Sequence, residues 1–310
     1  MIPHPFNPLG ASLSIENGTE QFPFLIQNES DFVAFRKALI NGNTWTNVHH
    51  KLMADLDLSG ISFTGANAQY YGVFDGNFKV IRNFSLTTST NNTGLFQWLG
   101  GSVRRLGIEN IYIDTRTNPV NYYTGGLCGA SVGGVIEQCY VTGTILTGNG
   151  RTGGITGAGN AIIRNCWTNV AISGTAGGAI GGIIGNRGGC DKCLAIGNLT
   201  LSSGSNIGGI SGAYNSSSWP GVVANCVAAM NSVKSYRING DGTVGSNNYA
   251  LNTMLVNGAT VTGTDTSANG ANATIQQLKS LAFYRDTMGW DMDNIWEIDD
   301  GNDFPKLRGF

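Results

Sequence analysis

Cysteines are the residues of this chain whose spacing most clearly raises the question of chemistry. Four of the six end a shared phrase: Ile136-Glu-Gln-Cys139, Ile163-Arg-Asn-Cys166, Cys190-Asp-Lys-Cys193 and Val223-Ala-Asn-Cys226. Cys190 and Cys193 form a Cys-x-x-Cys pair, which can bind zinc or exchange disulfides, but the second pair or histidine partner of a zinc site is missing. We therefore expect the four phrase-ending cysteines to be buried free thiols that pack as small hydrophobic side chains, with no cofactor.

Carboxylates are the second candidate for chemistry, because two or three of them on one face would indicate a glycosidase or a lyase. Between Arg116 and Gly240 the only acids are Glu137 and Asp191. Both sit beside the cysteine phrase, two repeats apart, which places them roughly 10 Å apart at strand spacing. That distance is near the outer limit for an inverting pair. The three histidines contain no His-Glu-x-x-His motif of a metallopeptidase. We expect no enzyme activity, with a carbohydrate-active lyase or glycosidase as the alternative.

Aspartates near the end of the chain could hold a calcium ion through their oxygen atoms. Asp291, Asp293, Asp299, Asp300 and Asp303 lie within thirteen positions. The pattern lacks the glycine and the terminal glutamate of a calcium loop. We expect a solvated loop and no bound metal, and Asp299, Asp300 and Asp303 are weak candidates for ligands.

Aromatic residues next to the cysteines are the better candidates for binding. If the cysteines point inward, Tyr140 and Trp167 point outward on neighbouring strands, stacked about 4.8 Å apart. Flat rings in a row can hold sugar rings, and Tyr122 and Tyr123 can frame the same side. The alternatives are that a terminal segment or a partner covers this face, or that the pair only stiffens the sheet.

A repeated glycine phrase reveals the elements that position these residues. It reads Thr124-Gly-Gly-Leu-Cys-Gly129, Thr152-Gly-Gly-Ile-Thr-Gly157, Gly181-Gly-Ile-Ile-Gly185 and Ile207-Gly-Gly-Ile-Ser-Gly212. Its apolar residue recurs at 127, 155, 183 and 210. A nearly constant spacing of this length indicates a solenoid. The strand after each cysteine alternates small or apolar residues with polar ones, as expected for one buried face. We therefore predict an all-β chain, a parallel β-helix, in which the cysteines and the apolar residues form two inward stacks.

The two ends of the chain are predicted to close this solenoid. Residues 31–41 are expected to form a helix capped by Ser30, and the Asp75-Gly76 pair predicts a tight hairpin within residues 71–81. Residues 274–284 are expected to be helical. Strands within 290–298 and 304–307 should follow, with tryptophans plugging the last coil, whereas residues 246–273 are an irregular coil or a loop.

Composition excludes several classes of partner. The chain has 18 basic and 20 acidic residues, a net charge of -2 and only 12% charged residues, so it has no electrostatic footprint for nucleic acid or an anionic membrane. No apolar run of about 18 residues is present, so we expect no membrane insertion of this segment. We expect neither a secretion signal nor an anchor within the sequence itself.

The phrases Gly126-Leu-Cys-Gly129 and Asn165-Cys-Trp167 resemble those of the GLUG-repeat family of bacterial surface and adhesin-like proteins. The flanking segments Phe74-Asp-Gly-Asn77 and Trp296-Glu-Ile-Asp-Asp300 are also similar to those that bracket such repeats. The resemblance implies a right-handed β-helix of about five to six coils and a secreted or cell-surface location. Members also occur beside peptidase domains that cleave immunoglobulin A. It transfers no catalytic residue.

These observations predict a tail over residues 1–17 and a single β-helix domain over 18–310. The domain is divided into an N-terminal cap with the first coils (18–93), GLUG-like repeats (94–245), and an irregular coil with a C-terminal cap (246–310). The expected function is a non-enzymatic, extracellular adhesin-like binding or scaffold module. Its expected partner is a glycan or surface protein of a host or neighbouring cell. The alternatives are a carbohydrate-active enzyme or a passive spacer in a larger surface peptidase.

Overall fold

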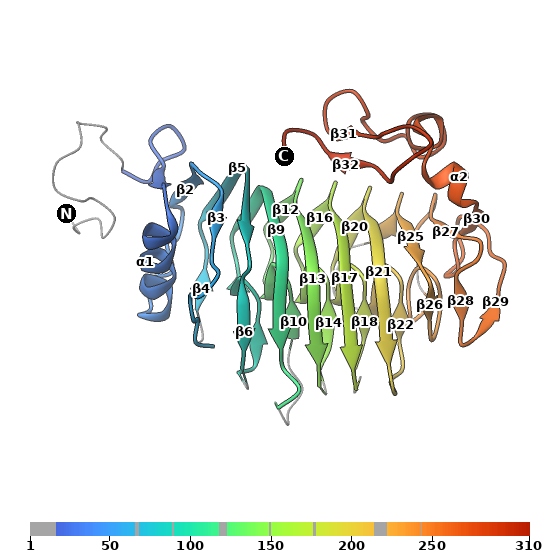
Figure 1. Ribbon diagram of the computed structural model, residues 1–310, viewed down its shortest axis with the longest axis horizontal. Coiled ribbons are helices and arrows are strands. Elements are labelled where there is room, and N and C mark those ends of the chain that lie inside the picture. Colours follow the sequence, from blue (N-terminus) through green and yellow to red (C-terminus); the bar gives the residue numbers. More distant parts are fainter. Residues whose placement is uncertain are drawn as a thin grey trace.

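A computed structural model shows that the chain is an all-β solenoid of about eight turns, in which parallel strands stack from coil to coil (Figure 1). The structure describes residues 17–65, 68–88, 90–117, 123–148, 150–175, 178–213, 222–242 and 244–310. The parallel β-helix is confirmed. The coil count exceeds the expected five to six, because the segments before residue 94 and after residue 245 also contribute strands to the stack.

The long sheet has 16 strands and runs the length of the molecule. Its strands are β1 (Phe24–Ile26), β2 (His49–Leu52), β3 (Leu56–Asp57), β5 (Val73–Arg82), β6 (Ser85–Thr87), β9 (Ser102–Asp114), β12 (Val135–Glu137), β13 (Tyr140–Thr147), β16 (Ile162–Arg164), β17 (Trp167–Gly174), β20 (Gly189–Asp191), β21 (Leu194–Leu201), β24 (Val223–Ala224), β25 (Val227–Met230), β27 (Tyr249–Leu251) and β30 (Ala271–Ala273).

Two shorter sheets complete each coil. The five-stranded sheet contains β7 (Asn92–Thr93), β10 (Tyr123–Gly125), β14 (Arg151–Gly153), β18 (Ile180–Gly181) and β22 (Ile207–Gly208). The six-stranded sheet contains β4 (Gln69–Tyr70), β8 (Phe96–Leu99), β11 (Cys128–Ser131), β15 (Thr156–Gly159), β19 (Ile184–Asn186) and β23 (Ser211–Ala213). A repeat therefore visits the five-stranded sheet, the six-stranded sheet and then the long sheet twice.

The glycine phrase forms the corner between the five-stranded and six-stranded sheets. A Cβ on Gly125 would lie 2.3 Å from the carbonyl oxygen of Cys128, so a side chain has no room at this corner. A second corner precedes each cysteine, where Gln138, Asn165, Lys192 and Asn225 all have φ between 50° and 54°. Asparagine tolerates this left-handed conformation better than most residues, which explains its recurrence before the cysteine.

The interior contains the two predicted stacks. Leu127, Ile155, Ile183 and Ile210 are fully buried, and so are Cys139, Cys166, Cys193 and Cys226. The strands after the cysteines pair in register, with Tyr140 opposite Trp167 and Trp167 opposite Leu194. The predicted inward orientation of the cysteines is therefore confirmed.

A helix covers the N-terminal end of the solenoid, as predicted (Figure 1). Helix α1 (Glu29–Ile40) begins two residues before the predicted start, because the side chain of Asn28 and not that of Ser30 caps it by accepting a hydrogen bond from the backbone N–H of Asp31. Its Phe35 packs against Tyr70, Phe74 and Phe96 in the first coils.

The hairpin predicted at Asp75-Gly76 is wrong. Strand β5 passes through this dipeptide and pairs in parallel with β2, β3 and β9, with an irregularity between Asp75 and Lys79. A Cβ on Gly76 would lie 2.3 Å from the carbonyl oxygen of Arg105, so this glycine allows close approach of the next coil. Asn77 and Phe78 have positive φ and bend the strand without reversing it.

Residues 246–273 form the last coils, where β27 and β30 extend the long sheet. A small three-stranded sheet contains β26 (Ser232–Val233), β28 (Leu255–Val256) and β29 (Ala259–Thr260).

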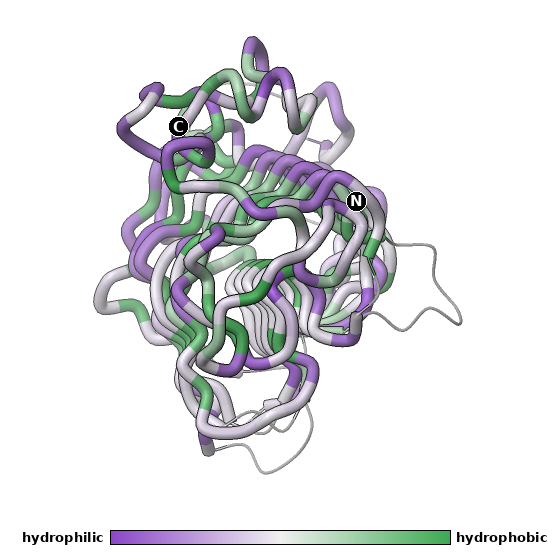
Figure 2. Tube along the Cα trace, turned by 90° about the vertical axis from the view of Figure 1, so that its right-hand side faces the viewer, coloured by the Kyte–Doolittle hydropathy of each residue, from purple (hydrophilic) through white to green (hydrophobic). Residues whose placement is uncertain are grey.

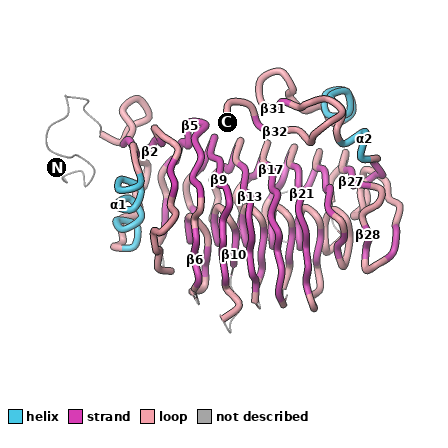
Figure 3. The backbone as a smooth tube through the Cα atoms, in the orientation of Figure 1, coloured by secondary structure: helices cyan, strands magenta, loops and turns pink. Residues whose placement is uncertain are grey.

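The C-terminal segment contains short helices and strands, as predicted, but it does not plug the last coil. Its elements are α2 (Ile275–Leu278), the π-helix η1 (Phe283–Thr287), β31 (Trp296–Glu297) and β32 (Lys306–Leu307). They run back along the outside of the long sheet (Figures 1 and 3). Figure 2 looks along the solenoid and shows this segment as a separate layer outside the coils. We call residues 274–310 the C-terminal cover. No helix in the described part of the chain is long and apolar enough to cross a membrane.

Candidate functional site

An outward apolar column follows the cysteines along the long sheet. It consists of Tyr140, Trp167, Leu194, Val227 and Tyr249, which are cross-strand partners in register. The rings of Tyr140 and Trp167 are stacked, with centroids 4.7 Å apart and planes inclined by 7°. The predicted aromatic pair therefore exists, and we call the five residues the outer column.

The C-terminal cover buries much of the outer column. Tyr140 is only 5% exposed and Trp167 is half-buried, and Leu194 and Val227 belong to one apolar cluster with Trp290 and Trp296 of the cover. The ring of the terminal residue Phe310 packs edge-on against Tyr140, with centroids 4.9 Å apart. The two rings point outward as predicted, and of the alternatives left open for this face the structure shows cover by a terminal segment, because an apolar column on consecutive coils is favourable to bury and the chain supplies its own cover.

Polar contacts fix the cover at the corners before the cysteines. The indole N–H of Trp296 donates to Oδ1 of Asn165 over 3.3 Å, and that of Trp290 donates to the carbonyl oxygen of Asn225 over 3.1 Å. The left-handed asparagines of the repeat therefore provide acceptors to the cover as well as a tight corner.

The hydroxyl of Tyr140 also has a partner. It donates to Oε1 of Glu109 over 2.7 Å, and the other carboxylate oxygen of Glu109 binds Arg82. Burial, and then this bond to Glu109, raise the pKa of Tyr140 well above its usual value, so the phenol is neutral at physiological pH. The group acts as a hydrogen-bond donor within the protein.

The other two predicted binding residues do not join this face. Tyr122 lies outside the described residues. Tyr123 belongs to β10 in the five-stranded sheet, and its ring is 5.6 Å from the guanidinium carbon of Arg151. A binding role for any of the four aromatic residues stays a prediction.

Three thiols meet inside the solenoid. The sulfur atoms of Cys190, Cys193 and Cys226 lie within 4.8 Å of one another, and those of Cys190 and Cys226 are 3.7 Å apart. Cys226 comes one coil after the Cys-x-x-Cys pair, and the repeat alignment over Cys193 was the signal that could have predicted this group. All six cysteines are free and buried. Burial raises the pKa of Cys190 and Cys193, whereas at Cys226 burial is outweighed by hydrogen bonds with these two thiols, which lower its pKa to about 5. The thiolate that metals and disulfide exchange require is therefore disfavoured at the first two sulfur atoms and favoured at the third.

Packing of these three thiols without a bound metal ion stays a prediction. Soft metal ions bind thiolates, but structural zinc takes four ligands, and the group within the described residues offers three. Burial also raises the pKa of Cys139 and Cys166, and that of Cys128 to about 12.

The two acids of the repeats are separated by a basic residue. Arg164 is the cross-strand partner of both Glu137 and Asp191, which places the two carboxylates two coils apart as predicted. Glu137 forms an ion pair with Arg164 over 2.7 Å, and Asp191 accepts a hydrogen bond from the Asn225 side chain over 2.7 Å. Both carboxylates thus have structural partners, and no other acid stands beside either of them on its neighbouring strands.

The candidate calcium ligands also have hydrogen-bond or ion-pair partners within the C-terminal cover. Asp299 accepts from the side chain of Asn302, Asp300 accepts from the backbone N–H of Leu281, and Asp303 pairs with Lys306. Among the described residues, these three carboxylates do not converge on one point as an ion would require.

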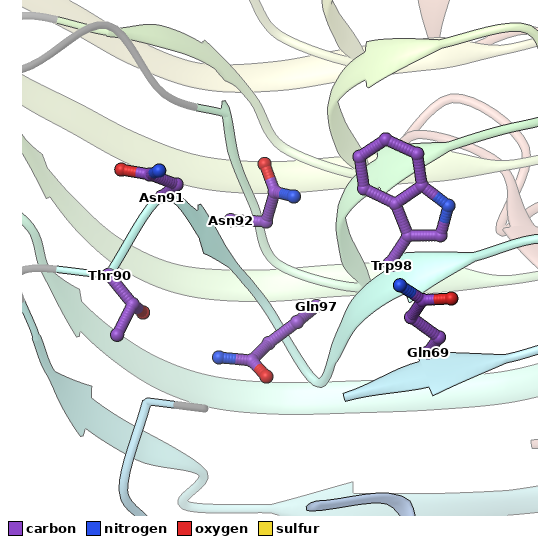
Figure 4. A pocket seen from close by; sticks show the side chains of 6 residues that line it. All are labelled: Gln69, Thr90, Asn91, Asn92, Gln97 and Trp98. Carbon is purple, nitrogen blue, oxygen red and sulfur yellow. The ribbon is translucent and has the colours of Figure 1, made fainter. Parts of the chain in front are cut away.

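A polar pocket lies at the N-terminal edge of the two short sheets (Figure 4). Its volume is about 520 Å³, and it is lined by Gln69, Thr90, Asn91, Asn92, Gln97 and Trp98. None of these side chains carries a charge. Gln97 is fully buried, and its Oε1 accepts a hydrogen bond from the backbone N–H of Ala68 over 2.7 Å, whereas its Nε2 has no partner within the described part of the chain.

Sequence reasoning missed this pocket, although a signal was present. Asn92-Thr-Gly-Leu-Phe-Gln97 is a shortened version of the glycine phrase, and the structure aligns Phe96 with Cys128. Gln97 therefore stands where the later repeats carry the last glycine of the phrase.

Comparison with known proteins identifies the repeat. The family model described as the GLUG motif matches residues 120–146. The chain therefore carries the GLUG motif. In the structure, the matched GLUG repeat corresponds to one coil, which comprises β10, β11, β12 and most of β13. The resemblance noted from the sequence is confirmed.

Two known proteins are similar to this GLUG-repeat chain over larger regions. A crystal structure of a protein from Bacteroides ovatus, named provisionally as an immunoglobulin A1 protease, superposes with a TM-score of 0.74 and 26% identity, and the match covers 94% of each chain. Halomucin from Haloquadratum walsbyi is 31% identical over 159 residues, which is 46% of this chain. The match spans only 2% of the length of halomucin.

Proposed function

We propose that this chain is a non-catalytic β-helical module of an extracellular protein, which acts as an adhesin-like scaffold. The observation that carries this proposal is that the chain covers its N-terminal end and its outer column with its own segments. Helix α1 covers one end and the C-terminal cover buries the outer column, which leaves a rigid rod with a largely uncharged polar surface.

The arrangement of charged groups supports a role without catalysis. Glycosidases of the usual kind need two carboxylates about 5 to 9.5 Å apart across the substrate. Glu137 and Asp191 each have a structural partner, and Arg164 lies between their strands. The polar pocket is lined by amides, a threonine and a tryptophan, which supply neither a general acid nor a nucleophile of the common types.

The similar proteins support a location outside the cell. A protease that acts on immunoglobulin A1 meets its substrate in an extracellular fluid. We propose the same location for this chain, with a glycan or a surface protein of a host or neighbouring cell as its partner. The likeness to the Bacteroides ovatus protein also favours a second role, as a spacer that holds a peptidase domain in a larger protein.

An activity screen tests the proposal. The purified chain is incubated with pectins, host glycans and immunoglobulin A1, and new reducing ends, unsaturated products and peptide fragments are measured. We expect no turnover. Reproducible turnover that disappears in a Glu137→Gln or Asp191→Asn variant would overturn the proposal, and an Asn169→Ala variant, changed at an exposed position, serves as the control.

A further inference from the structure

The polar pocket lies where the described part of the chain supplies no further strand to the five-stranded sheet. On the later coils, Gly129, Gly157, Gly185 and Gly212 occupy one position of the six-stranded sheet. A Cβ on Gly129 would lie 2.4 Å from the backbone nitrogen of Thr93 on β7, and one on Gly157 would lie 2.3 Å from that of Thr124 on β10. Each glycine thus makes room for the five-stranded sheet of the preceding coil.

Gln97 occupies the same position on the first of these coils. In the described chain, the five-stranded sheet ends at β7, so no preceding strand presses against Gln97. The position can therefore hold a long side chain, and the space beside it forms the pocket. Figure 4 shows Thr90, Asn91 and Asn92 along one side of this space, with Trp98 and Gln69 at the other end.

The side-chain amide nitrogen of Gln97, Nε2, is a hydrogen-bond donor beside the pocket. Its amide is fully buried, and among the described residues only the oxygen has a hydrogen-bond partner. Leaving a buried donor unpaired costs about 1–3 kcal/mol, so such groups are rare in folded proteins and call for an explanation. A ligand hydroxyl or carbonyl in the pocket would accept this hydrogen bond.

The lining specifies the chemistry of the ligand. The four amides can each donate and accept, as a set of sugar hydroxyls requires, and the half-buried indole of Trp98 offers an apolar face. With no charge on the lining, the pocket has no counter-ion for a uronate, a sialate or a phosphate. Its volume of about 520 Å³ lies within the range of small-molecule sites.

We propose that this pocket binds a neutral saccharide unit, with Trp98 stacking on one sugar face and Gln97 donating to a hydroxyl. The proposal rests on the extracellular, non-catalytic role proposed above and names the ligand class of that role. The proposed binding site is separate from the outer column. The pocket belongs to the two short sheets, whereas the outer column and the C-terminal cover that packs on it lie on the long sheet.

The test uses the full chain and neutral sugars as probes. Glucose, galactose, mannose, N-acetylglucosamine and their neutral disaccharides are titrated by ligand-observed NMR and calorimetry, alongside galacturonate, sialic acid and a neutral Gly/Ser/Asn peptide. We expect at least one neutral sugar to bind with a Kd of about 1 mM, which is usual for one small shallow site. Trp98→Ala and Gln69→Ala should each weaken binding at least tenfold.

A matched control tests whether the effect is local. Tyr112 is an exposed aromatic residue on the long sheet, 42% exposed, and Tyr112→Ala should leave binding unchanged. Unfolding midpoints show whether each variant is folded; if Trp98→Ala is not, Gln69→Ala decides. The proposal is overturned if no neutral sugar binds, if only the acidic sugars or the peptide bind, or if both pocket variants bind as well as the parent. Binding followed by cleavage would support the pocket but refute the non-catalytic role, so the two failures are distinguishable.

Discussion

Each repeat cysteine and the first residue of the long-sheet strand that follows it are buried in two different ways. Cys139, Cys166, Cys193 and Cys226 point inward and are covered by other residues of the coils. Tyr140, Trp167, Leu194 and Val227 point outward, and they are covered by a segment that follows them by as much as 170 positions, from Tyr140 to Phe310.

The inward cysteines and the outward residues therefore belong to two different layers of the structure. The inward thiols are part of what makes each coil stack on the next, so a change there affects the whole solenoid. The outer column and the C-terminal cover form a second layer that rests on the long sheet, in which β13, β17 and β21 pair with one another and not with the cover. We therefore expect the two layers to unfold separately.

The largest effect is expected for a charge in the inward layer. Cys166→Asp places a carboxylate among buried thiols and backbone carbonyls, where no cation is within reach, and should destabilise the protein by more than about 3 kcal/mol. Denaturant unfolding measures this loss. Asn169→Asp, at an exposed position of β17, the strand that follows Cys166, should change stability little, and an unchanged midpoint in Cys166→Asp would mean that Cys166 does not point inward.

A large loss of stability that is confined to the C-terminal cover is expected for a change at Trp296. Trp296 is fully buried and bonded to Asn165, and Trp296→Ala should cost the cover about 3–5 kcal/mol of packing. Hydrogen exchange should accelerate in residues 274–310 while β13 and β17 remain protected, because their ladder bonds do not involve the cover. Trp296→Phe retains most of the contact and should have a smaller effect. Equal loss of protection in both layers would show that they unfold as one.

A pH dependence of stability should report on Tyr140 in the outer column. Burial, and then Glu109, raise the pKa of Tyr140, so the folded protein retains the phenolic proton to a higher pH than the unfolded chain. This contribution to stability is complete below the unfolded pKa of about 10 and is lost as the pH rises above it. Tyr140→Phe should make the loss of stability above that pH less steep, whereas Trp167→Phe, which keeps the phenol, should leave the slope as it is. Urea unfolding at pH 8 and above gives both slopes.

The smallest effect is expected at the end of the chain. Phe310 is 37% exposed and contacts Tyr140 and Phe78 through its ring edge. Phe310→Ala should lower stability by about 1 kcal/mol, the size of one aromatic pair. It should also expose Tyr140, so any sugar binding by the Tyr140–Trp167 pair should strengthen in this variant. Weaker binding would indicate that Phe310 itself belongs to a binding surface.

The inward layer could be predicted from the sequence, because the glycine phrase, the apolar residue and the cysteine recur with one period. The cover could not be located in this way, since its residues are outside the repeat and make contacts distant in sequence. One signal was available: the residue after the cysteine is Tyr, Trp, Leu or Val, which is unusually apolar for an outward position. The hairpin failed because Asp75-Gly76 has the same sequence as a tight turn, although close packing on Arg105 requires its glycine.

The cover also limits how the repeat number can change. From the contacts of η1 with Tyr249 to that of Phe310 with Tyr140, it crosses the coils of β27, β25, β21, β17 and β13. Duplication or loss of one GLUG repeat within this span would change the length of the sheet by about 4.8 Å, whereas the cover would keep its own length. Phe310 would then meet a different coil. Recombination among these repeats would therefore produce chains whose C-terminal cover no longer matches the coils beneath it. The fixed length of the cover thus sets the number of coils that it can span.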